Sequence, residues 1–291
     1  MTSRSGKPFQ TVFVGGAPRT GTTILHAIIC TSPQVNQYVG ECSYFSTFLV
    51  PYFHGLKAFD VHTKHYFGSP TAFQEFHRSV LEYVLQKFWM ATGSPEILAL
   101  KDPLLTIHFP HLAQLLPEAR FIVTVRDPRD AVLSLCEVLQ RLNPGSNLAD
   151  HLVDACTQYA SIYGAILDSR EKFENRLLLV DYNQLVRGKE LEKLLAFGIG
   201  GLSPENIWQS SLTNVNEYAG GEWWSKLYGQ PISDQSVGRY ASKLSEELLS
   251  TIQNMCGAVF DRLCDWMNRQ LGPVQFSQAG DAQPSCSTSA P

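Results

Sequence analysis

The residues with the clearest chemistry lie in a short glycine-bearing loop between a predicted strand and a predicted helix. Residues 15–23 read GGAPRTGTT and follow an apolar run at 11–14. Backbone N–H groups of such a loop, with the partial positive charge at the start of the next helix, bind anions. The hydroxyls of Thr20, Thr22 and Thr23 add donors. The loop is therefore predicted to cradle a phosphate.

The loop differs from that of a nucleoside triphosphatase in the position of its cation. Gly16 and Gly21 have P-loop spacing, but Thr22 stands where the lysine is expected, and the cation is Arg19, inside the loop. Without the lysine that grips a triphosphate, the loop suits a 5′-phosphate carrying one further anionic group better than ATP with magnesium. This points away from an ordinary kinase.

A second candidate anion site follows another apolar run. Residues 121–125 lead into Arg126, and Pro128 with Asp130 predicts a helix start that puts Ser134 on the helix. Because open α/β sheets bind ligands at the carboxyl ends of their strands, Arg126 and Ser134 are predicted to hold a second phosphate. The alternative is an Arg126 that only pairs with a neighbouring aspartate.

The elements that must position these residues alternate between strands and helices. Four continuous apolar runs are typical of parallel strands buried on both faces, at 11–14, 97–100, 121–125 and 177–180. Segments with helical periodicity separate them, at 22–30, 71–92, 107–116, 129–142, 148–173, 189–197 and 246–270. The alternation predicts an α/β fold with a parallel sheet flanked by helices.

Bulk composition narrows the class of protein. The 291 residues are 44% hydrophobic and 17% charged, which is ample for a buried core, and the net charge of −4 gives no general attraction to nucleic acid. We expect one domain over 7–272 and a disordered tail over 273–291, where Ser, Ala, Pro and Gln dominate. No run is apolar enough for a predicted membrane span. Seven cysteines without a CxxC pair favour free thiols in a reducing compartment.

Two motifs in order, about 100 residues apart, resemble those of the sulfotransferases. Residues 18–23 (PRTGTT) look like the 5′-phosphosulfate loop of that family, and Arg126 through Ser134 looks like its 3′-phosphate motif. Arg19, with LKDP at 100–103 and VDYNQLV at 180–186, resembles the tyrosylprotein sulfotransferase branch and its bacterial relatives. The resemblance spans roughly residues 10–270.

The resemblance implies the fold, the donor and the reaction. We expect a P-loop-like sulfotransferase domain that moves a sulfuryl group from 3′-phosphoadenosine 5′-phosphosulfate to an acceptor hydroxyl, leaving adenosine 3′,5′-bisphosphate. No metal is expected, because the transferred group carries less charge than a phosphoryl group. The alternatives are a P-loop nucleotide kinase, with the aspartate of residues 178–181 on magnesium, and a nucleotide-binding protein without chemistry.

Three residues are expected to carry the chemistry. The resemblance places Arg19 and Lys101 on the transferring group, where fixed cations stabilise charge that develops in the transition state. Glu41 follows Gly40 at the position of the family's acidic motif and is predicted to be the general base. His108 is the rival base, because cytosolic sulfotransferases use a histidine downstream of this strand, although its apolar surroundings favour a packing role.

The remaining expected residues bind the nucleotide. The resemblance assigns adenosine and 3′-phosphate contacts to Tyr182 and to the segment 238–240, which we expect to close over the nucleotide. The full set of expected donor-binding residues is Pro18, Arg19, Thr20, Gly21, Thr22, Thr23, Arg126, Ser134, Tyr182, Gly238, Arg239 and Tyr240.

The acceptor and the location are predicted from weaker signals. Animal members of the branch are Golgi-anchored and disulfide-bonded, whereas neither feature is recognised here, so we expect a cytoplasmic enzyme. That expectation favours a small-molecule or glycan acceptor, with a peptide tyrosine as the alternative. The aromatic residues near Trp223 would cover a site or serve the interface of a homodimer.

Overall fold

The fold is built on four parallel strands, as the computed structural model shows for residues 8–209 and 225–270. The strands are β1 (Gln10–Gly15), β2 (Ile97–Lys101), β3 (Arg120–Val125) and β4 (Leu177–Asp181). They pair in the order β2-β1-β3-β4, all parallel, with Val14 opposite Lys101 and Val125 opposite Asp181. The predicted α/β fold and its four strands are confirmed, each strand within one residue of its expected bounds at either end.

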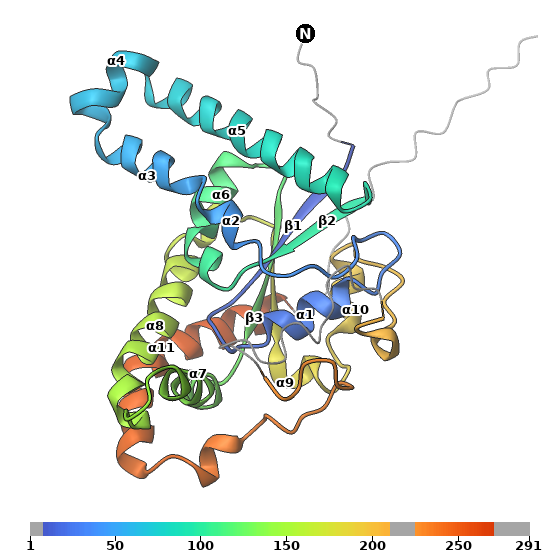
Figure 1. Ribbon diagram of the computed structural model, residues 1–291, viewed down its shortest axis with the longest axis vertical. Helices are drawn as coiled ribbons and strands as arrows, with labels where there is room; N and C mark the ends of the chain where they lie inside the picture. The colour runs from blue at the N-terminus through green and yellow to red at the C-terminus, as the bar shows by residue number, and fades with distance from the viewer. Residues whose placement is uncertain (1–7, 210–224, 271–291) are drawn as a thin grey trace, which may run out of the picture.

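Helices cover both faces of this sheet (Figure 1). Near the front in Figure 1 lie α1 (Thr22–Ile29), α9 (Tyr182–Leu185) and α10 (Leu191–Ala196), which share a buried cluster with Val12, Val14 and Ile122. The other face packs against α6 (Phe109–Leu115), α7 (Pro128–Leu142), α8 (Leu152–Asp168) and α11 (Glu246–Gln270). Because both faces are covered, the strands are continuous apolar runs rather than alternating ones.

The helices between β1 and β2 include a projecting arm that the sequence analysis predicted only in part. The arm consists of α3 (Leu49–Lys57), a π-helical turn (Phe59–Thr63), α4 (Lys64–Phe67) and α5 (Pro70–Ala91), and it follows the short α2 (Ser43–Ser46). Only α5 was expected, because Pro51, Gly55 and Gly68 interrupt the periodicity of the shorter helices. Tyr52 stacks on Phe73 at a ring-centroid distance of 5.7 Å, which fixes α3 against α5.

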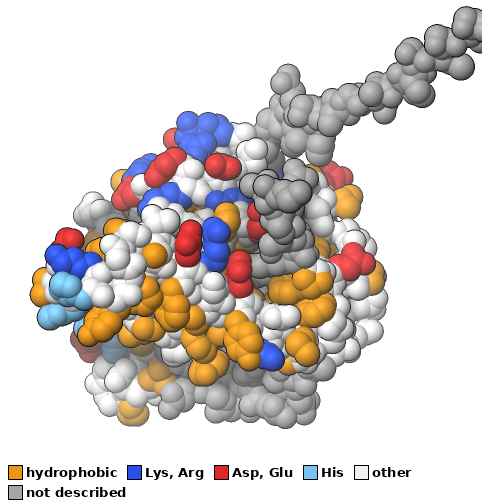
Figure 2. Space-filling model, turned by 90° about the horizontal axis from the view of Figure 1, so that it is seen from above, with side chains coloured by type: hydrophobic (Ala, Val, Ile, Leu, Met, Phe, Trp, Pro, Cys, Tyr) orange, Lys and Arg blue, Asp and Glu red, His pale blue; other side chains and the backbone are white. Residues whose placement is uncertain are grey.

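The outer side of the arm is apolar in places. Phe76, Tyr83 and Met90, each seven residues apart on α5, are 49%, 60% and 57% exposed. Figure 2 shows hydrophobic side chains gathered in a band on the face seen from above. Within the described residues, no helix has the length and apolarity needed to cross a bilayer.

Short 3₁₀ turns lie between the longer helices and strands. The segment expected as one helix over 148–173 is α8 flanked by two 3₁₀ turns, and Asn147 with Asp150 forms a capping box at its start. The other 3₁₀ turns include η2 (Leu104–His108) and η7 (Arg239–Ser242). The expected tail at 273–291, the domain limit at 272 and the aromatic pair at 223–224 lie outside the described residues.

Candidate active site

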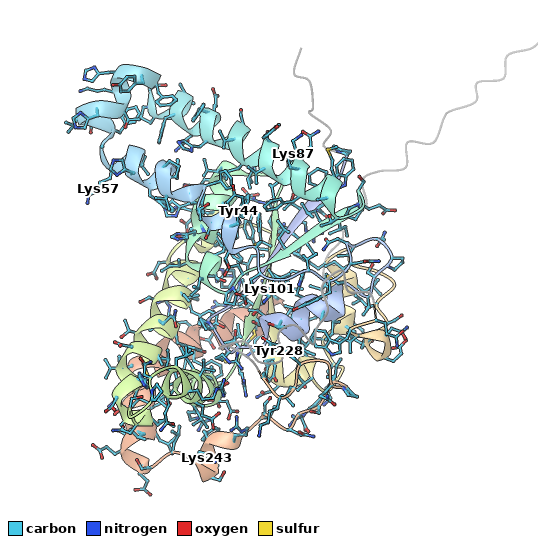
Figure 3. The ribbon with its side chains drawn as sticks, viewed as in Figure 1. Tyr44, Lys57, Lys87, Lys101, Tyr228 and Lys243 are labelled. Atoms are coloured by element: carbon cyan, nitrogen blue, oxygen red, sulfur yellow. The ribbon has the colours of Figure 1, made fainter. Side chains whose placement is uncertain are left out.

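The four strands deliver the candidate residues to one edge of the sheet. Because the strands are parallel, their carboxyl ends meet there, and the loop after β1, Lys101 at the end of β2, Arg126 after β3 and Tyr182 after β4 all lie along it. Figure 3 shows Lys101 near the middle of the molecule at the end of β2.

The loop after β1 has the conformation of an anion cradle. Gly21, with φ 97°, precedes the first turn of α1, where Thr22 and Thr23 begin a helix whose first N–H groups lack intrahelical acceptors. That turn contains no acidic residue. The start of α1 can therefore receive a phosphate or sulfate group through its N–H groups and dipole.

Not every polar group of the loop faces an anion. Thr20 is fully buried, and its hydroxyl donates to Ala17 O at 2.6 Å and lies 3.0 Å from Thr124 Oγ1. Gly16 N donates to Thr106 Oγ1 at 2.8 Å. The hydroxyl of Thr20, expected as a ligand donor, is therefore already used to hold the loop against β3.

Gly21 is packed against the ring of Tyr182. A Cβ on Gly21 would lie 2.2 Å from the Tyr182 ring, and its φ of 97° is in the left-handed region. Tyr182 can approach the loop this closely only because residue 21 has no side chain.

The second anion motif lies directly against the loop. Arg126 Nη1 donates to Arg19 O at 2.9 Å, and Arg19 Nε donates to Ser134 Oγ at 3.3 Å. Arg126 does not pair with Asp127, whose carboxylate caps α7 at Arg129 N and binds the Arg129 side chain. The alternative of an ion pair with Asp127 is therefore not what the structure has. Asp130, the other aspartate considered, accepts from Gly238 N and Tyr240 N, although its charge also raises the pKa of Arg126.

Arg126 is held by partners that leave one of its nitrogens without an acceptor. It is 6% exposed, its Nη2 donates to Ser236 O, and its guanidinium lies 4.5 Å above the Tyr182 ring. Its Nε is buried and has no hydrogen-bond partner within the described part of the chain. Burial lowers the pKa of Arg126, as do Arg19 and Arg239 nearby, although Tyr182 opposes this. An anion accepting from Nε would satisfy this site.

Buried tyrosines on α8 hold the end of β3 in place. Tyr159 donates its hydroxyl to Arg126 O at 2.8 Å, and Tyr163 donates to Thr124 O. Burial raises the pKa of both phenols, so they stay protonated and donate. Sequence reasoning missed both residues, because they look like ordinary core positions of a helix.

The segment 236–240 docks on the second motif. Asp130 accepts from Gly238 N at 2.6 Å and from Tyr240 N at 3.2 Å, and Tyr182 hydroxyl lies 2.6 Å from Ser236 Oγ. Arg239 pairs with Glu137 at 2.7 Å. The expected segment 238–240 thus docks on α7 through Asp130 and Glu137, and Ser236, two residues before it, is the residue that reaches Arg126. Ser236 was missed, since nothing distinguishes it within a polar stretch.

Lys101 and Glu41 form an ion pair at the end of β2. Lys101 Nζ lies 2.7 Å from Glu41 Oε1 and donates to Thr23 Oγ1 at 3.2 Å. Lys101 is 2% exposed, whereas the Glu41 side chain is 48% exposed. The pair places a buried cation next to the start of α1 and a solvent-accessible carboxylate beside it.

His108 lies in an aromatic cluster. Its ring centroid is 4.8 Å from that of Phe53, and Phe53 is 4.8 Å from His111. Burial, and then His111, lower the pKa of His108. These contacts describe a packed, neutral ring.

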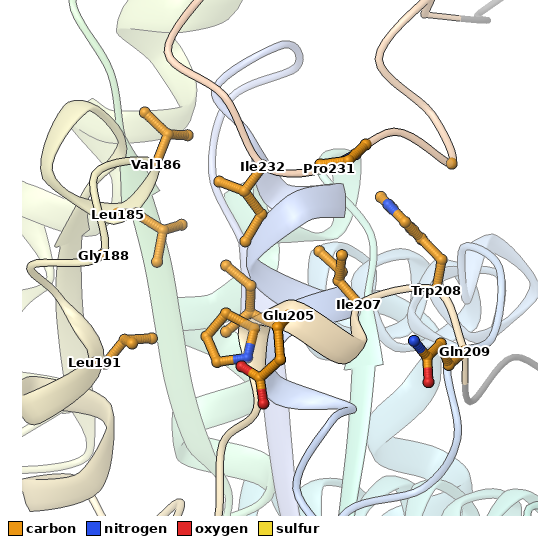
Figure 4. A pocket seen from close by; sticks show the side chains of 13 residues that line it. Leu185, Val186, Gly188, Leu191, Glu205, Ile207, Trp208, Gln209, Pro231 and Ile232 are labelled. Atoms are coloured by element: carbon orange, nitrogen blue, oxygen red, sulfur yellow. The ribbon is translucent and has the colours of Figure 1, made fainter.

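A cavity of about 540 Å³ is lined by α9 and by the segments 204–209 and 229–232 (Figure 4). It begins at Leu185 and Val186, one turn beyond Tyr182, and continues to Ile207, Trp208 and Ile232. Its lining is mostly aliphatic, and Trp208 Nε1 donates to Gln230 O at 3.0 Å. Sequence reasoning missed this cavity, because its walls come from segments without a motif.

Asp181, the aspartate that a kinase would use for magnesium, has a structural role. Its Oδ1 accepts from Gln184 N at 3.1 Å and caps α9. Within residues 8–209 and 225–270, no group of three or more His, Cys, Asp or Glu side chains is arranged to hold a metal ion.

The chain belongs to the sulfotransferase family, whose profile matches residues 11–197. Protein-tyrosine sulfotransferase 1 of Danio rerio is 28% identical over 201 residues, which cover 66% of this chain and 53% of that protein. A putative protein-tyrosine sulfotransferase of Caenorhabditis briggsae is 30% identical over 128 residues, 44% of this chain and 43% of that protein. The chain thus spans about half the length of the curated relatives it matches.

Solved structures agree with the fold. The sulfotransferase domain from the curacin biosynthetic pathway superposes with a TM-score of 0.58 at 15% identity, covering 88% of this chain and 98% of that one. A sulfotransferase from Alicyclobacillus acidocaldarius gives a TM-score of 0.53 at 11% identity, covering 89% and 96%. The family and fold expected from the two motifs are confirmed.

The expected cytoplasmic location is wrong. The curated relatives are protein-tyrosine sulfotransferases, which are Golgi membrane enzymes. The expectation rested on cysteine usage and on no leader being recognised in the sequence. The expected homodimer and the expected lack of nucleic-acid binding stay predictions.

Proposed function

We propose that this chain transfers a sulfuryl group from 3′-phosphoadenosine 5′-phosphosulfate to an acceptor hydroxyl. The observation that carries the proposal is the contact between the two anion motifs, in which Arg126 Nη1 reaches Arg19 O and Arg19 Nε reaches Ser134 Oγ. Two anion sites this close suit one nucleotide with a phosphate at each end of its ribose. The membership of the family supports the same donor.

The residues present fit this donor. We assign the 5′ end to the start of α1 and the 3′-phosphate to Arg126, whose buried Nε lacks an acceptor, and to Ser134. Tyr182 and the apolar cavity that begins at Leu185 are assigned to the adenine ring. The two faces of an adenine ring are flat and apolar, so an aliphatic cavity beside an aromatic residue suits them.

Lys101 and Glu41 are assigned to the chemistry. When bound, the donor supplies a sulfate group joined to a leaving phosphate. Lys101, already beside Thr23 at the start of α1, stabilises negative charge at that point. An anion near Lys101 competes with Glu41 for the ammonium group, which leaves the half-exposed carboxylate free to take the proton of the acceptor hydroxyl.

The acceptor is assigned to the open side of this pair. Tyr44 follows Glu41 by three residues and is 66% exposed, and Leu104 follows Lys101 by three residues and is 58% exposed. The preference for a small molecule or glycan rested on the cytoplasmic expectation and is withdrawn with it. An exposed ring and an aliphatic side chain beside the base favour a hydroxyl on an aromatic group, either a peptide tyrosine or a small phenol.

The test is transfer of labelled sulfate from the donor to a panel of a tyrosine peptide, a phenol and a glycan. We expect the tyrosine peptide or the phenol to be labelled, with one adenosine 3′,5′-bisphosphate formed per sulfate. Lys101→Ala and Glu41→Gln should each lower kcat by roughly 100-fold or more, while Glu41→Gln keeps its affinity for the bisphosphate. Full activity of Glu41→Gln would remove Glu41 from its role as base.

A further inference from the structure

The outer edge of β2 is completed by an irregular segment. β2 ends the strand order β2-β1-β3-β4, so β1 pairs with only one of its edges. Along the other edge, Ile97 N donates to Gln34 O at 2.9 Å and Asn36 N donates to Ile97 O at 3.3 Å. Farther along, Cys42 N donates to Lys101 O at 2.9 Å. The chain between α1 and α2 therefore touches β2 at two separate points.

Between these two points, one side chain takes the place of a strand. Asn36 Oδ1 accepts from Ala99 N at 2.7 Å, and Asn36 Nδ2 donates to Ala99 O at 3.2 Å and to Gln37 O at 2.9 Å. Asn36 is 2% exposed, so its amide is inside the protein. A side-chain amide offers one acceptor and one donor side, as a peptide group does, and it satisfies the edge of β2 at Ala99.

Because the Asn36 side chain occupies the edge of β2 at Ala99, the backbone that leads to Glu41 does not have to pair there. Residues 37–41 need not pair with β2, although only Leu100 separates Ala99 from Lys101 along that strand. The five residues form a loop that returns at Cys42, where the bond to Lys101 O fixes it. Glu41 is the last residue of that loop, and its carboxylate meets Lys101 Nζ at 2.7 Å.

We propose that Asn36 is a positioning residue that sets Glu41 against Lys101 by closing the edge of β2 at Ala99. The inference rests on the proposed function, in which Glu41 takes the acceptor proton. Asn36 acts only through the backbone of residues 37–42. Its role is to place the loop, and its amide has no part in binding the donor.

Alanine at position 36 would leave one specific group unpaired. His26 Nε2 lies 3.1 Å from Ala99 O and stays as a partner for that carbonyl. Ala99 N, in contrast, would lose its acceptor in a buried place, and Gln37 O would lose its donor. Tyr38, whose buried ring packs against His26, and Cys42 would remain as anchors of the loop. We expect the backbone between them to loosen and Glu41 to move relative to Lys101.

The test is a double-mutant cycle between Asn36→Ala and Glu41→Gln. Asn36→Ala should lower kcat by at least 10-fold and leave the dissociation constant for adenosine 3′,5′-bisphosphate within about twofold. In the Glu41→Gln background, Asn36→Ala should lower kcat by less than about threefold, because the residue that Asn36 positions has lost its function. Gln37→Ala, an exposed neighbour in the same loop, should change neither constant.

Two results overturn the proposal. One is an equal loss from Asn36→Ala in both backgrounds, and the other is a loss of bisphosphate affinity that parallels the loss of kcat. Asn36→Leu keeps about the same side-chain size but removes both the acceptor for Ala99 N and the donor to Gln37 O, and it takes the same place in the cycle where the alanine variant does not fold.

A second measurement works without turnover. Hydrogen exchange should show the Cys42 amide losing protection in Asn36→Ala, with the Val14 and Val123 amides of the central strands unchanged. If the wild-type chain transfers no sulfate, the proposed function fails, but hydrogen exchange still tests whether Asn36 places the loop. Unchanged protection of the Cys42 amide in Asn36→Ala contradicts that role.

Discussion

Arg126 holds the strained peptide of Arg19. Arg19 has a φ of 68°, in the left-handed region where residues other than glycine cost about 1–3 kcal/mol. Its carbonyl accepts from Arg126 Nη1 at 2.9 Å. The guanidinium that we assign to the 3′-phosphate therefore also fixes the loop assigned to the 5′ end, so the two ends of the site are formed together.

The first prediction concerns phosphate selectivity. The wild-type chain should bind adenosine 3′,5′-bisphosphate more tightly than adenosine 5′-phosphate, and Arg126→Ala should lose most of that preference. A hydrogen bond to a charged group contributes about 1.5–3 kcal/mol, or roughly 10- to 100-fold. Calorimetric titration of both ligands measures the effect.

The matched control for Arg126 is Arg129→Ala. Arg129 lies on the same helix start, but its guanidinium is engaged by Asp127 and lies 4.1 Å from the Tyr240 ring centroid. Its removal should leave the preference for the bisphosphate within about threefold. An Arg126→Ala variant that keeps the wild-type preference would show that the 3′-phosphate binds elsewhere.

The second prediction separates backbone strain from a steric clash. Gly21 and Gly145 both have a φ of 97°, but a Cβ on Gly21 would meet the Tyr182 ring at 2.2 Å, whereas one on Gly145 would meet nothing within 4 Å. Gly145→Ala should cost about 1 kcal/mol of unfolding free energy. Gly21→Ala should cost more and should also weaken bisphosphate binding, because Tyr182 must move. If Gly21→Ala and Gly145→Ala lowered the unfolding free energy equally and left bisphosphate affinity equally unchanged, the clash with Tyr182 would be contradicted.

The sequence predicted the elements and the chemistry better than it predicted the contacts. Continuous apolar runs identify buried parallel strands, because this signal is local. The two anion sites predicted from the glycines, Arg19 and Arg126 stay predictions, although the structure brings their residues together. The ion pair of Lys101 with Glu41 joins residues 60 positions apart, and only the register of β2 with the segment before α2 brings them together. The Thr20 hydroxyl points into the protein rather than toward a ligand, and this depends likewise on Thr124, which lies on β3.

The arm and the cavity could not be predicted for a different reason. Tyr52 and Phe73 stabilise short helices through tertiary contacts that have no local periodicity. The cavity beside Tyr182 is formed by side chains from four separate segments. Neither feature leaves a pattern in a single stretch of sequence.

The third prediction concerns the pH dependence of stability. Burial, and then the charge of Lys101, lower the pKa of His26 from 6.5 to about 3, although its bond to Ala99 O opposes this. The unfolded chain therefore binds a proton that the folded chain refuses between these values, so stability falls as the pH drops below about 6.5. From pH 7 to pH 5 this group alone should cost about 2 kcal/mol.

The check is urea unfolding of the wild type and of His26→Gln at both pH values. The glutamine can still donate to Ala99 O but cannot titrate. The wild type should lose about 2 kcal/mol more than the variant on acidification. Parallel losses in the two proteins would mean that His26 is accessible to protons in the folded state.

The fourth prediction distinguishes the two candidate bases. His108→Asn should keep kcat within about threefold, because the ring is held in the aromatic cluster with Phe53. The measurement is the rate of sulfate transfer alongside the rate of Glu41→Gln. A 100-fold loss in His108→Asn, with Glu41→Gln unaffected, would exchange the roles of the two residues.

The most direct test of the account is a calorimetric titration of the wild-type chain with adenosine 3′,5′-bisphosphate and with ADP, each with and without magnesium. The account predicts one bisphosphate bound per chain, with an affinity that a chelator does not change, and far weaker binding of ADP. Binding of ADP that equals or exceeds that of the bisphosphate, or that requires magnesium, would contradict it.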